Sequence, residues 1–347
     1  MAWSRPTKII FLFVAILSLC SFFPVTTEAD TVAKPSYTRL FYFRDNALAR
    51  QSFFTNYKYI DIFAPQSYAL DSTGNLSGSL DQNLVAFAHI SGVKIMPLVT
   101  NGAFSEASYQ GILDNPGAQD VAIASLINEA KLNGYYGWEI DFEQMDMTYR
   151  DKFSVFIKKA GAEMKQNNLS LSVSVIAKFS DDPKAYPSNL WTNLIGVYDY
   201  SALASSTDFV SLMSYDDPYS KGPVVEYPWL NLVLDYSLKY IPAEKLSLGI
   251  PLYYWKWNDA TGKLVGVGGN EGIDNVLKKY KVTSHFSVAQ QEPYLTYKSG
   301  KVNYTIWYEN ARSVKKKINL VTDNHLQGFS AWVLGLELPS IYNVIGK

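Results

Sequence analysis

Cysteine is almost absent from this sequence. The single cysteine, Cys20, lies in an apolar N-terminal run, so the chain beyond residue 29 has none. This absence excludes disulfide bonds and thiolate metal sites in residues 30–347. The three histidines, His89, His285 and His325, are far apart and lack metal-ligand spacing such as His-x-x-x-His. We therefore expect no metal and no other cofactor, and a core that suffices without covalent links.

Excess charge of either sign is also missing. The 31 basic and 32 acidic residues give a formal net charge of −1, and no basic run stands out. This balance excludes the basic surface by which proteins bind nucleic acid or an anionic membrane. Aromatic residues, in contrast, are plentiful, with 25 Tyr, 18 Phe and 8 Trp. Some of them must form the core, but such a load also suits stacking against the apolar faces of sugar rings.

The N-terminal segment has the pattern of a secretory signal peptide. Arg5 and Lys8 precede an apolar run over 9–23, and Thr27-Glu28-Ala29 resembles a small-x-small cleavage site. The apolar run is short for a membrane span, and a retained N-terminal anchor is the alternative. We expect residues 1–29 to be a signal peptide removed near Ala29. We expect the mature protein to be secreted and free of the membrane. We also expect it to be a monomer.

The rest of the chain alternates strand-like and helix-like segments. Eight short segments rich in Val, Ile, Leu, Phe or Tyr have the composition of strands buried on both faces. They are Arg39–Phe43, Tyr59–Ala64, Lys94–Thr100, Tyr136–Glu143, Ser170–Ala177, Asp208–Tyr215, Leu246–Tyr253 and Gly328–Leu334. Amphipathic helical patterns lie between them, most clearly at Val121–Leu132, Tyr149–Asn167 and Pro228–Tyr240.

Eight such units predict an α/β fold, a (β/α)8 TIM barrel. The long gap between the seventh and eighth strands, about 257–326, predicts a small α+β insertion. It holds β-like segments at 294–297 and 304–307 and a helix around 311–318. Its glycine-rich stretch 266–272 does not link a strand to a helix in the dinucleotide manner, so we interpret it as a flexible rim loop. No repeat or linker divides residues 30–347, which indicates one catalytic domain with this insertion.

One segment carries three carboxylates at alternate positions. Glu139, Asp141 and Glu143 alternate with Ile140 and Phe142. In a strand, alternate residues share a face, so the three acids would point one way. Crowded carboxylates push their pKa values apart, and one then holds a proton near neutral pH, as an acid/base hydrolase requires. The alternative is a half-exposed strand whose acids face water.

Further chemical groups lie where other predicted strands end. In (β/α)8 barrels the catalytic groups are at the C-terminal ends of strands. Glu143 ends the fourth predicted strand, Tyr215 and Asp216 end the sixth, and Trp332 lies near the end of the eighth. Three strand ends thus offer an acid, a Tyr-Asp pair and a tryptophan.

Together these segments resemble glycoside hydrolase family 18, the chitinase-like family. The fourth-strand motif of that family, Asp-Gly-x-Asp-x-Asp-x-Glu, corresponds to 136–143 here. Residues 212–216 are similar to its sixth-strand Met-x-Tyr-Asp, 248–253 to its seventh-strand Gly-x-Pro-x-Tyr, and 328–335 to its eighth strand. Residues 64–68 and 96–101 resemble the bacterial spore-cortex-type branch. The similarity covers nearly the whole mature chain.

The resemblance implies a retaining hydrolase of β-1,4-linked polymers containing N-acetylglucosamine, with chitin and peptidoglycan as candidates. Glu143 would be the general acid that protonates the glycosidic oxygen and then the base for water. Asp141 would orient the substrate's 2-acetamido group, which attacks the anomeric carbon in place of an enzyme carboxylate. Tyr215 would hold the acetamido carbonyl, and Trp332 would form the floor under the sugar at subsite −1.

Other residues are candidates for substrate contact. The resemblance implies that Asp216 contacts the substrate or the Asp141 network. Tyr253 and Trp255, where the seventh strand meets the insertion, line outer sugar subsites in one interpretation and pack the insertion onto the barrel in the other. Tyr68 and Asn101 follow the second and third strands and are further candidates.

Two positions depart from the family motif. Tyr136 replaces its first Asp, and Glu139, which we group with the substrate-binding residues, replaces its second. The family implies that Asp141 passes a proton between position 139 and Glu143, so the longer Glu139 is expected to affect rate or pH dependence. A catalytically weak or inactive carbohydrate-binding lectin is therefore the alternative, although retention of Glu143 favours an enzyme. A barrel enzyme for phosphorylated substrates is disfavoured, because no Gly-rich phosphate loop follows the seventh or eighth strand.

Overall fold

A computed structural model describes residues 36–346. The predicted signal peptide, residues 1–29, lies outside them. Within the described range, no helix is both long enough and apolar enough to cross a membrane.

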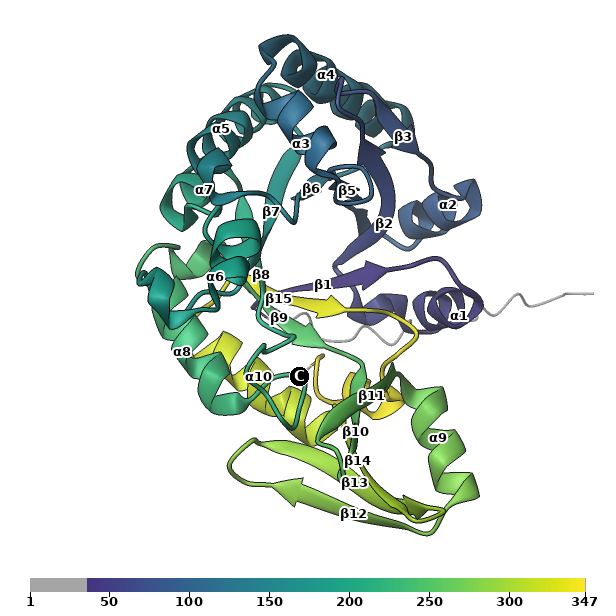
Figure 1. The fold of residues 1–347 in the computed structure, drawn as a ribbon. Helices are drawn as coiled ribbons and strands as arrows, with labels where there is room; N and C mark the ends of the chain where they lie inside the picture. Colours follow the sequence, from purple (N-terminus) through teal and green to yellow (C-terminus); the bar gives the residue numbers. More distant parts are fainter. Residues whose placement is uncertain (1–35, 347) are drawn as a thin grey trace, which may run out of the picture. The chain divides into compact units, whose positions relative to one another are not determined.

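Eight parallel strand positions close into a barrel, as the sequence predicts (Figure 1). Hydrogen bonding follows the order β1-β15-β9-β8-β7-β6-β5-β2, and pairing of β1 with β2 closes the ring. The strands are β1 (Thr38–Phe43), β2 (Ile62–Leu70), β4 (Lys94–Ile95) with β5 (Leu98–Thr100), β6 (Gly137–Asp141), β7 (Ser170–Ile176), β8 (Phe209–Met213), β9 (Leu246–Pro251) and β15 (Gly328–Trp332). The short β3 (Leu76–Gly78) pairs with the end of β2 in antiparallel fashion.

Helices surround the barrel on its outside (Figure 1). They are α1 (Ala47–Asn56), α2 (Gln82–Ile90), α3 (Glu106–Leu113), α4 (Pro116–Asn133), α5 (Arg150–Gln166), α6 (Ser188–Leu190), α7 (Tyr200–Ser206), α8 (Tyr227–Ser237) and α10 (Ala311–Asp323). Local signals fix the ends of α4, since the Asn115 side chain caps its first N–H groups and Gly134 ends it in the left-handed conformation, with φ of 65°.

The core has two layers that follow from strand alternation. Phe41, Ile140 and Val173 point outward and pack with helix residues in one large apolar cluster. Their neighbours on the opposite strand face form a smaller cluster inside the barrel, which includes Leu40 and Met96. Both faces of each strand are therefore buried, as in other parallel sheets covered by helices.

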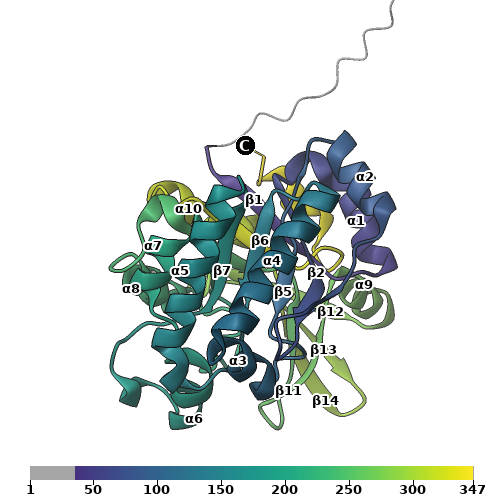
Figure 2. The same cartoon turned by 90° about the horizontal axis from the view of Figure 1, so that it is seen from above.

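The insertion between β9 and β15 is a second, antiparallel sheet. Its order is β11-β10-β14-β13-β12, and α9 (Asn270–Lys279) packs on one face through a small core of Ile273, Leu295, Tyr297 and Ile306. Its strands are β10 (Tyr254–Asn258), β11 (Lys263–Gly268), β12 (Val282–Ser287), β13 (Glu292–Ser299) and β14 (Val302–Trp307). Figure 2 shows this sheet at the same end of the barrel as α3 and α6.

The glycine-rich stretch 266–272 is ordered structure, so its interpretation as a flexible rim loop is wrong. It contains the end of β11 and the first turn of α9. Gly268 and Gly272 lie against the ring of Tyr254, where an added Cβ would come within 2.7 and 2.5 Å of the tyrosine oxygen. These glycines permit a close approach to an aromatic ring, a role that composition alone does not distinguish from loop flexibility.

Helix α10 contains the helix predicted around 311–318 within the insertion of about 257–326, and it contacts β9 and β15 of the barrel as well as β13. A buried ion triad joins this helix to the inserted sheet. Lys317 Nζ donates to Glu292 Oε1 at 2.6 Å and to Glu309 Oε1 at 2.5 Å. All three side chains are at most 2% exposed. Burial and the neighbouring Glu309 raise the pKa of Glu292 well above its usual range, since one lysine compensates two carboxylates.

Candidate active site

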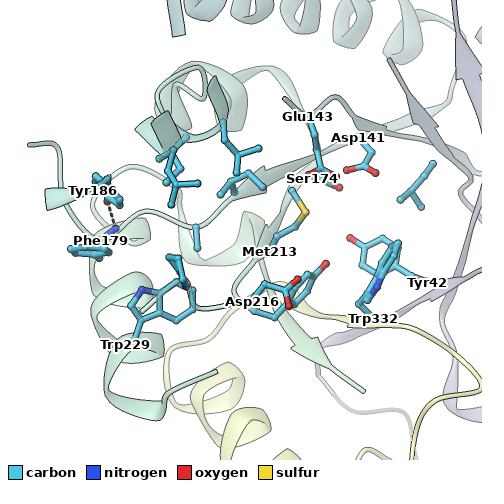
Figure 3. A pocket seen from close by; sticks show the side chains of 18 residues that line it. Tyr42, Asp141, Glu143, Ser174, Phe179, Tyr186, Met213, Asp216, Trp229 and Trp332 are labelled. Atoms are coloured by element: carbon cyan, nitrogen blue, oxygen red, sulfur yellow. Dashed lines mark hydrogen bonds between the residues drawn. The ribbon is translucent and has the colours of Figure 1, made fainter. Parts of the chain in front are cut away.

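The predicted catalytic groups meet in one cavity of about 340 Å³ at the C-terminal ends of the barrel strands (Figure 3). Asp141 ends β6 and Glu143 follows it. Tyr215 and Asp216 follow β8, and Trp332 ends β15. The volume is at the lower end of the range of small-ligand pockets, about 300–1,000 Å³. Three strand ends that are distant in sequence thus supply the groups expected of them.

Glu143 leaves the strand rather than continuing it. The predicted strand 136–143 ends at Asp141, and Gln144 has a positive φ of 54°, so the chain turns at this point. Burial, followed by the nearby charge of Asp216, raises the pKa of Glu143 to about 7. A carboxyl group with this pKa is partly protonated at neutral pH and can both donate and accept a proton.

Asn101 holds the backbone of Glu143 from the neighbouring strand. Its Nδ2 donates to the Glu143 carbonyl at 2.9 Å, and the Glu143 N–H donates to Asn101 Oδ1 at 3.0 Å. Backbone pairing of β5 with β6 ends at Thr100 and Asp141. The Asn101 side-chain amide continues this pairing, because it bonds to the backbone of Glu143. Asn101 is fully buried and does not line the cavity. It therefore positions the acid, where the sequence had suggested a substrate contact.

Removal of this amide should lower turnover without much effect on substrate binding. In Asn101→Ala, the Glu143 N–H and carbonyl lose both partners, at a cost of about 2–3 kcal/mol in stability. We expect kcat to fall about 10- to 100-fold while KM changes less than about threefold, because the carboxyl is misplaced but the sugar contacts remain. Steady-state kinetics and thermal unfolding measure the two effects. The comparison variant is Tyr198→Phe, which loses the hydroxyl that donates to the carbonyl of the neighbouring residue Phe142. Equal kcat values in Asn101→Ala and wild type would contradict the positioning role of Asn101.

Asp141 lies deeper in the cavity and is 3% exposed. Burial, then the charges of Glu143 and Glu139, raises its pKa well above the usual range. The polar side chains of Ser174 and Gln66 oppose this shift. A carboxyl group in this position favours its protonated form and is suited to hydrogen bonding with a neutral ligand group.

Glu139 is fully buried inside the barrel, below Asp141. Four hydroxyl groups donate to its carboxylate: Tyr42 at 2.5 Å and Ser174 at 2.6 Å to Oε1, and Ser172 at 2.7 Å and Ser211 at 3.0 Å to Oε2. Burial is tolerated because every lone-pair direction has a donor. Glu139 does not line the cavity, so it acts on a bound ligand only through Asp141 and its hydroxyl partners.

Tyr215, Asp216 and Tyr253 form a second polar group across the cavity. Burial, then the charges of Asp141 and Asp216, raises the pKa of Tyr215 well above its usual range, so its hydroxyl stays protonated. Asp216 has a positive φ of 56°, and Tyr253 donates its hydroxyl to Asp216 Oδ1. Tyr253 itself is buried and does not line the cavity. Tyr253 therefore holds the Asp216 carboxyl group in place without lining the cavity itself.

Aromatic residues complete the cavity in part where the sequence predicted them. Trp332 lines it, with its ring centroid 5.2 Å from that of Tyr42. Trp255 is half-buried outside the cavity, where it contacts Trp257 of the same strand and packs against the large apolar cluster of the barrel. Of its two interpretations, the structure thus shows packing of the insertion onto the barrel.

Tyr68 occupies a different place from the one expected. Its ring packs edge-on against Trp138, and its hydroxyl bonds to Glu129 and to the hydroxyl of Tyr135. The side chain thus lies between the barrel and α4, and the candidate substrate contact is replaced by a packing role. Strand β2 continues to Leu70, past its predicted end at Ala64, so Tyr68 lies within the strand and does not follow it.

Sequence reasoning missed several residues of the cavity wall. Tyr42 and Ser174 lie on β1 and β7, and Phe179 and Tyr186 lie on the segment after β7. The serines that alternate with Leu171, Val173 and Val175 were an available signal, because polar residues at every second position of a buried strand require polar partners. No comparable pattern marked Phe179 or Tyr186. Among residues 36–346, no group of three or more His, Cys, Asp or Glu side chains is arranged to hold a metal ion.

The pH dependence of any acid-catalysed reaction here should follow Glu143. The acid must carry its proton, so kcat/KM should fall as pH rises through about 7. Asp216→Asn removes a negative charge that raises the Glu143 pKa, so the falling limb should move to lower pH. Initial rates between pH 4 and 9 test this shift. An unchanged or upward-shifted limb in Asp216→Asn would count against the assignment.

Known proteins are similar to this chain in sequence and in fold. The family model for glycosyl hydrolases family 18 matches residues 6–337. The uncharacterized glycosylase YvbX of Bacillus subtilis (strain 168) is 27% identical over 300 residues, which cover 83% of this chain and 85% of YvbX. The cortical fragment-lytic enzyme of the same organism is 25% identical over 81% of this chain, and the match spans 66% of its length. The crystal structure of a chitinase from Chromobacterium violaceum ATCC 12472 aligns with a TM-score of 0.79 at 25% identity, covering 89% of this chain and 98% of that one.

Proposed function

The chain belongs to glycosyl hydrolase family 18 and is a glycosidase, and we propose that it cleaves β-1,4-linked polymers containing N-acetylglucosamine with retention at the anomeric carbon. The observation that carries this proposal is the pairing of Glu143, whose pKa is raised to about 7, with the buried Asp141 in one cavity. An acid that is protonated at neutral pH beside a second, deeper carboxyl group meets the needs of glycoside hydrolysis.

In the first step, the carbonyl oxygen of the substrate's own 2-acetamido group attacks the anomeric carbon. The glycosidic bond breaks, and Glu143 gives its proton to the departing oxygen. Asp141 accepts a hydrogen bond from the acetamido N–H, and Tyr215 donates one to the acetamido oxygen. The raised pKa of Asp141 supports this positioning role over nucleophilic attack, because a protonated carboxyl group is a poor nucleophile.

In the second step, Glu143, now a carboxylate, takes a proton from water. The water oxygen attacks the anomeric carbon of the cyclic oxazolinium ion, whose bond to the acetamido oxygen breaks. Two displacements on the same carbon give net retention. Trp332 supplies an apolar face beneath the sugar at subsite −1 and helps to exclude bulk water.

The replacement of the motif Asp by Glu139 is compatible with activity. Its carboxylate accepts hydrogen bonds from all four surrounding hydroxyl groups, so the extra methylene leaves no unpaired buried oxygen. A carbohydrate-binding lectin without turnover remains the outcome to exclude by experiment.

The test is release of product from N-acetylglucosamine oligomers and from purified peptidoglycan. Wild type should release reducing ends from at least one of them, and NMR of the first product should show the β-anomer. The faster substrate identifies the polymer. The names of two relatives, a chitinase and a cortical fragment-lytic enzyme, support including both. Binding of oligomers without any turnover by wild type would move the protein to the lectin class.

We also propose export from the cell, on the strength of the N-terminal pattern that ends near Ala29. Mass spectrometry of protein from culture medium and from cells would test this proposal. A mature N-terminus near residue 30 in the medium is expected, and retention of the whole chain within cells would contradict it.

A further inference from the structure

The cavity has two unlike sides (Figure 3). Trp332 and Tyr42 lie on one side of the carboxyl groups, and Phe179, Tyr186 and Trp229 lie on the other. The proposed mechanism uses only the Trp332 side and the carboxyl groups between the two. The other side has no role in the two chemical steps, although it belongs to the same continuous space.

This second side, here called the apolar half, is built mainly by the segment that follows β7. Its wall includes Ile176, Phe179, Tyr186, Leu190, Leu194 and Trp229. Leu194 belongs to a π-helical turn, Trp191–Ile195, and such turns are frequent at functional sites. The wall is thus formed mainly by the end of β7 together with the segment that follows it.

The hydroxyl of Tyr186 is unavailable to a ligand. It accepts from the N–H groups of Phe179 and Ser180 at 2.8 and 2.9 Å and donates to the Ser180 carbonyl at 3.0 Å. Its ring lies 4.7 Å from that of Phe179. Tyr186 therefore presents only apolar surface to the cavity, and its polar end stabilises the loop.

Trp229 supplies the polar feature that is left unpaired. Its indole Nε1 is buried and has no hydrogen-bond partner in the described part of the chain, although the residue lines the cavity. A buried N–H without an acceptor costs about 1–3 kcal/mol. Because this N–H is enclosed by the protein, Trp229 also presents apolar surface to the cavity.

Among the described residues, those that line the cavity provide no cation. Asp141, Glu143 and Asp216 line it, and none of the described residues in its wall is lysine, arginine or histidine. Lys178 lies on the same segment but is 3% exposed, and its Nζ donates to the Tyr198 carbonyl at 2.5 Å. A negatively charged group in the apolar half would therefore be desolvated beside three acids without a cation to pair with.

We propose that the apolar half is the leaving-group subsite and that it selects an uncharged sugar. The inference rests on the proposed function, which places the sugar that keeps its anomeric carbon on Trp332. A sugar chain that passes Glu143 then enters the apolar half. N-acetylglucosamine fits this chemistry, as does N-acetylmuramic acid whose lactyl carboxyl is in amide linkage. N-acetylmuramic acid with a free lactyl carboxylate does not.

The test uses two trisaccharides that differ only in charge. Both carry two β-1,4-linked N-acetylglucosamine units followed by a reducing-end N-acetylmuramic unit, with the lactyl carboxyl either free or as its N-methylamide. Release of the muramyl unit reports cleavage with that unit in the leaving-group subsite. We expect kcat/KM for the amide to exceed that for the free acid by at least about tenfold, because the carboxylate loses its hydration without gaining a partner.

Variants of the wall then test the residues. Leu194→Lys places a cation in the apolar half and should reduce the preference for the amide at least about fivefold. Leu132→Lys, at a position that is 81% exposed on α4, is the matched control and should leave the preference unchanged.

The outcomes separate this proposal from the proposed function. Equal rates for the two trisaccharides, or a preference that Leu194→Lys does not change, would overturn the subsite proposal while leaving the glycosidase reaction intact. Absence of cleavage of either trisaccharide and of N-acetylglucosamine oligomers by wild type would overturn the proposed function, and this proposal with it.

Discussion

Glu143→Gln should lower the rate of hydrolysis about 100- to 10,000-fold, the range expected when a general acid is removed. Glutamine has nearly the same size, so the two hydrogen bonds between Asn101 and the backbone at position 143 remain. Oligomer binding and thermal stability should therefore change little. Product release, oligomer binding by calorimetry and the Tm together test the expectation.

A matched control distinguishes the loss of the acid from loss of charge in general. Glu244→Gln makes the same chemical change at an exposed position before β9 and should leave the rate unaltered. Substantial turnover in Glu143→Gln, with correct folding, would remove Glu143 from the proposed mechanism. A large drop in Tm for Glu143→Gln would instead indicate that the carboxyl group serves the fold.

Asp141→Asn should lower the rate by a similar factor, about 100-fold or more, for a different reason. Asparagine keeps the shape but, unlike a carboxyl group, cannot lose a proton to balance positive charge that develops on the acetamido ring. The two variants should separate with an aryl glycoside of N-acetylglucosamine oligomers, whose nitrophenol leaving group departs without protonation. First-turnover release of nitrophenol should recover substantially in Glu143→Gln and remain low in Asp141→Asn. Equal recovery in both would contradict the division of roles.

The location of the site was predictable because its parts are local. The carboxylates at 139, 141 and 143, the Tyr-Asp pair at 215–216 and Trp332 are each read from one strand end, and barrel geometry brings strand ends together. The prediction needed no knowledge of distant contacts, since each group follows its own apolar run. The closed eight-stranded barrel was predictable for the same reason.

The roles that failed to follow from sequence depend on which side of a strand faces the barrel axis. In a barrel both faces are buried, so alternation separates two sets of residues without saying which set is inside. Tyr68 points outward to α4, and Glu139 points inward to four hydroxyl groups. Asn101 pairs with a backbone 42 positions away, and no feature within its own segment indicates that partner.

Composition also led to a wrong expectation where glycines permit close packing and do not provide flexibility. Gly268 and Gly272 in the insertion allow the Tyr254 ring to approach, whereas glycine-rich stretches usually suggest flexible loops. No pattern in the sequence around Trp229 indicated that this residue lines the cavity with its indole N–H buried and unpaired in the described structure. Both features require coordinates, because they concern what lies beside a residue in space.

The triad of Lys317, Glu292 and Glu309 has a consequence for the way this fold can be altered. It links a barrel helix to two strand ends of the inserted sheet, with every charge out of contact with water. A shortened chain that lacked the inserted sheet would leave Lys317 as a lone charge in an apolar seam, and the sheet alone would retain two acids without a counterion. The inserted sheet therefore cannot be removed or replaced independently of the barrel. Barrel and insertion constrain each other's sequences, and recombination between related proteins would have to transfer both sides of the seam together.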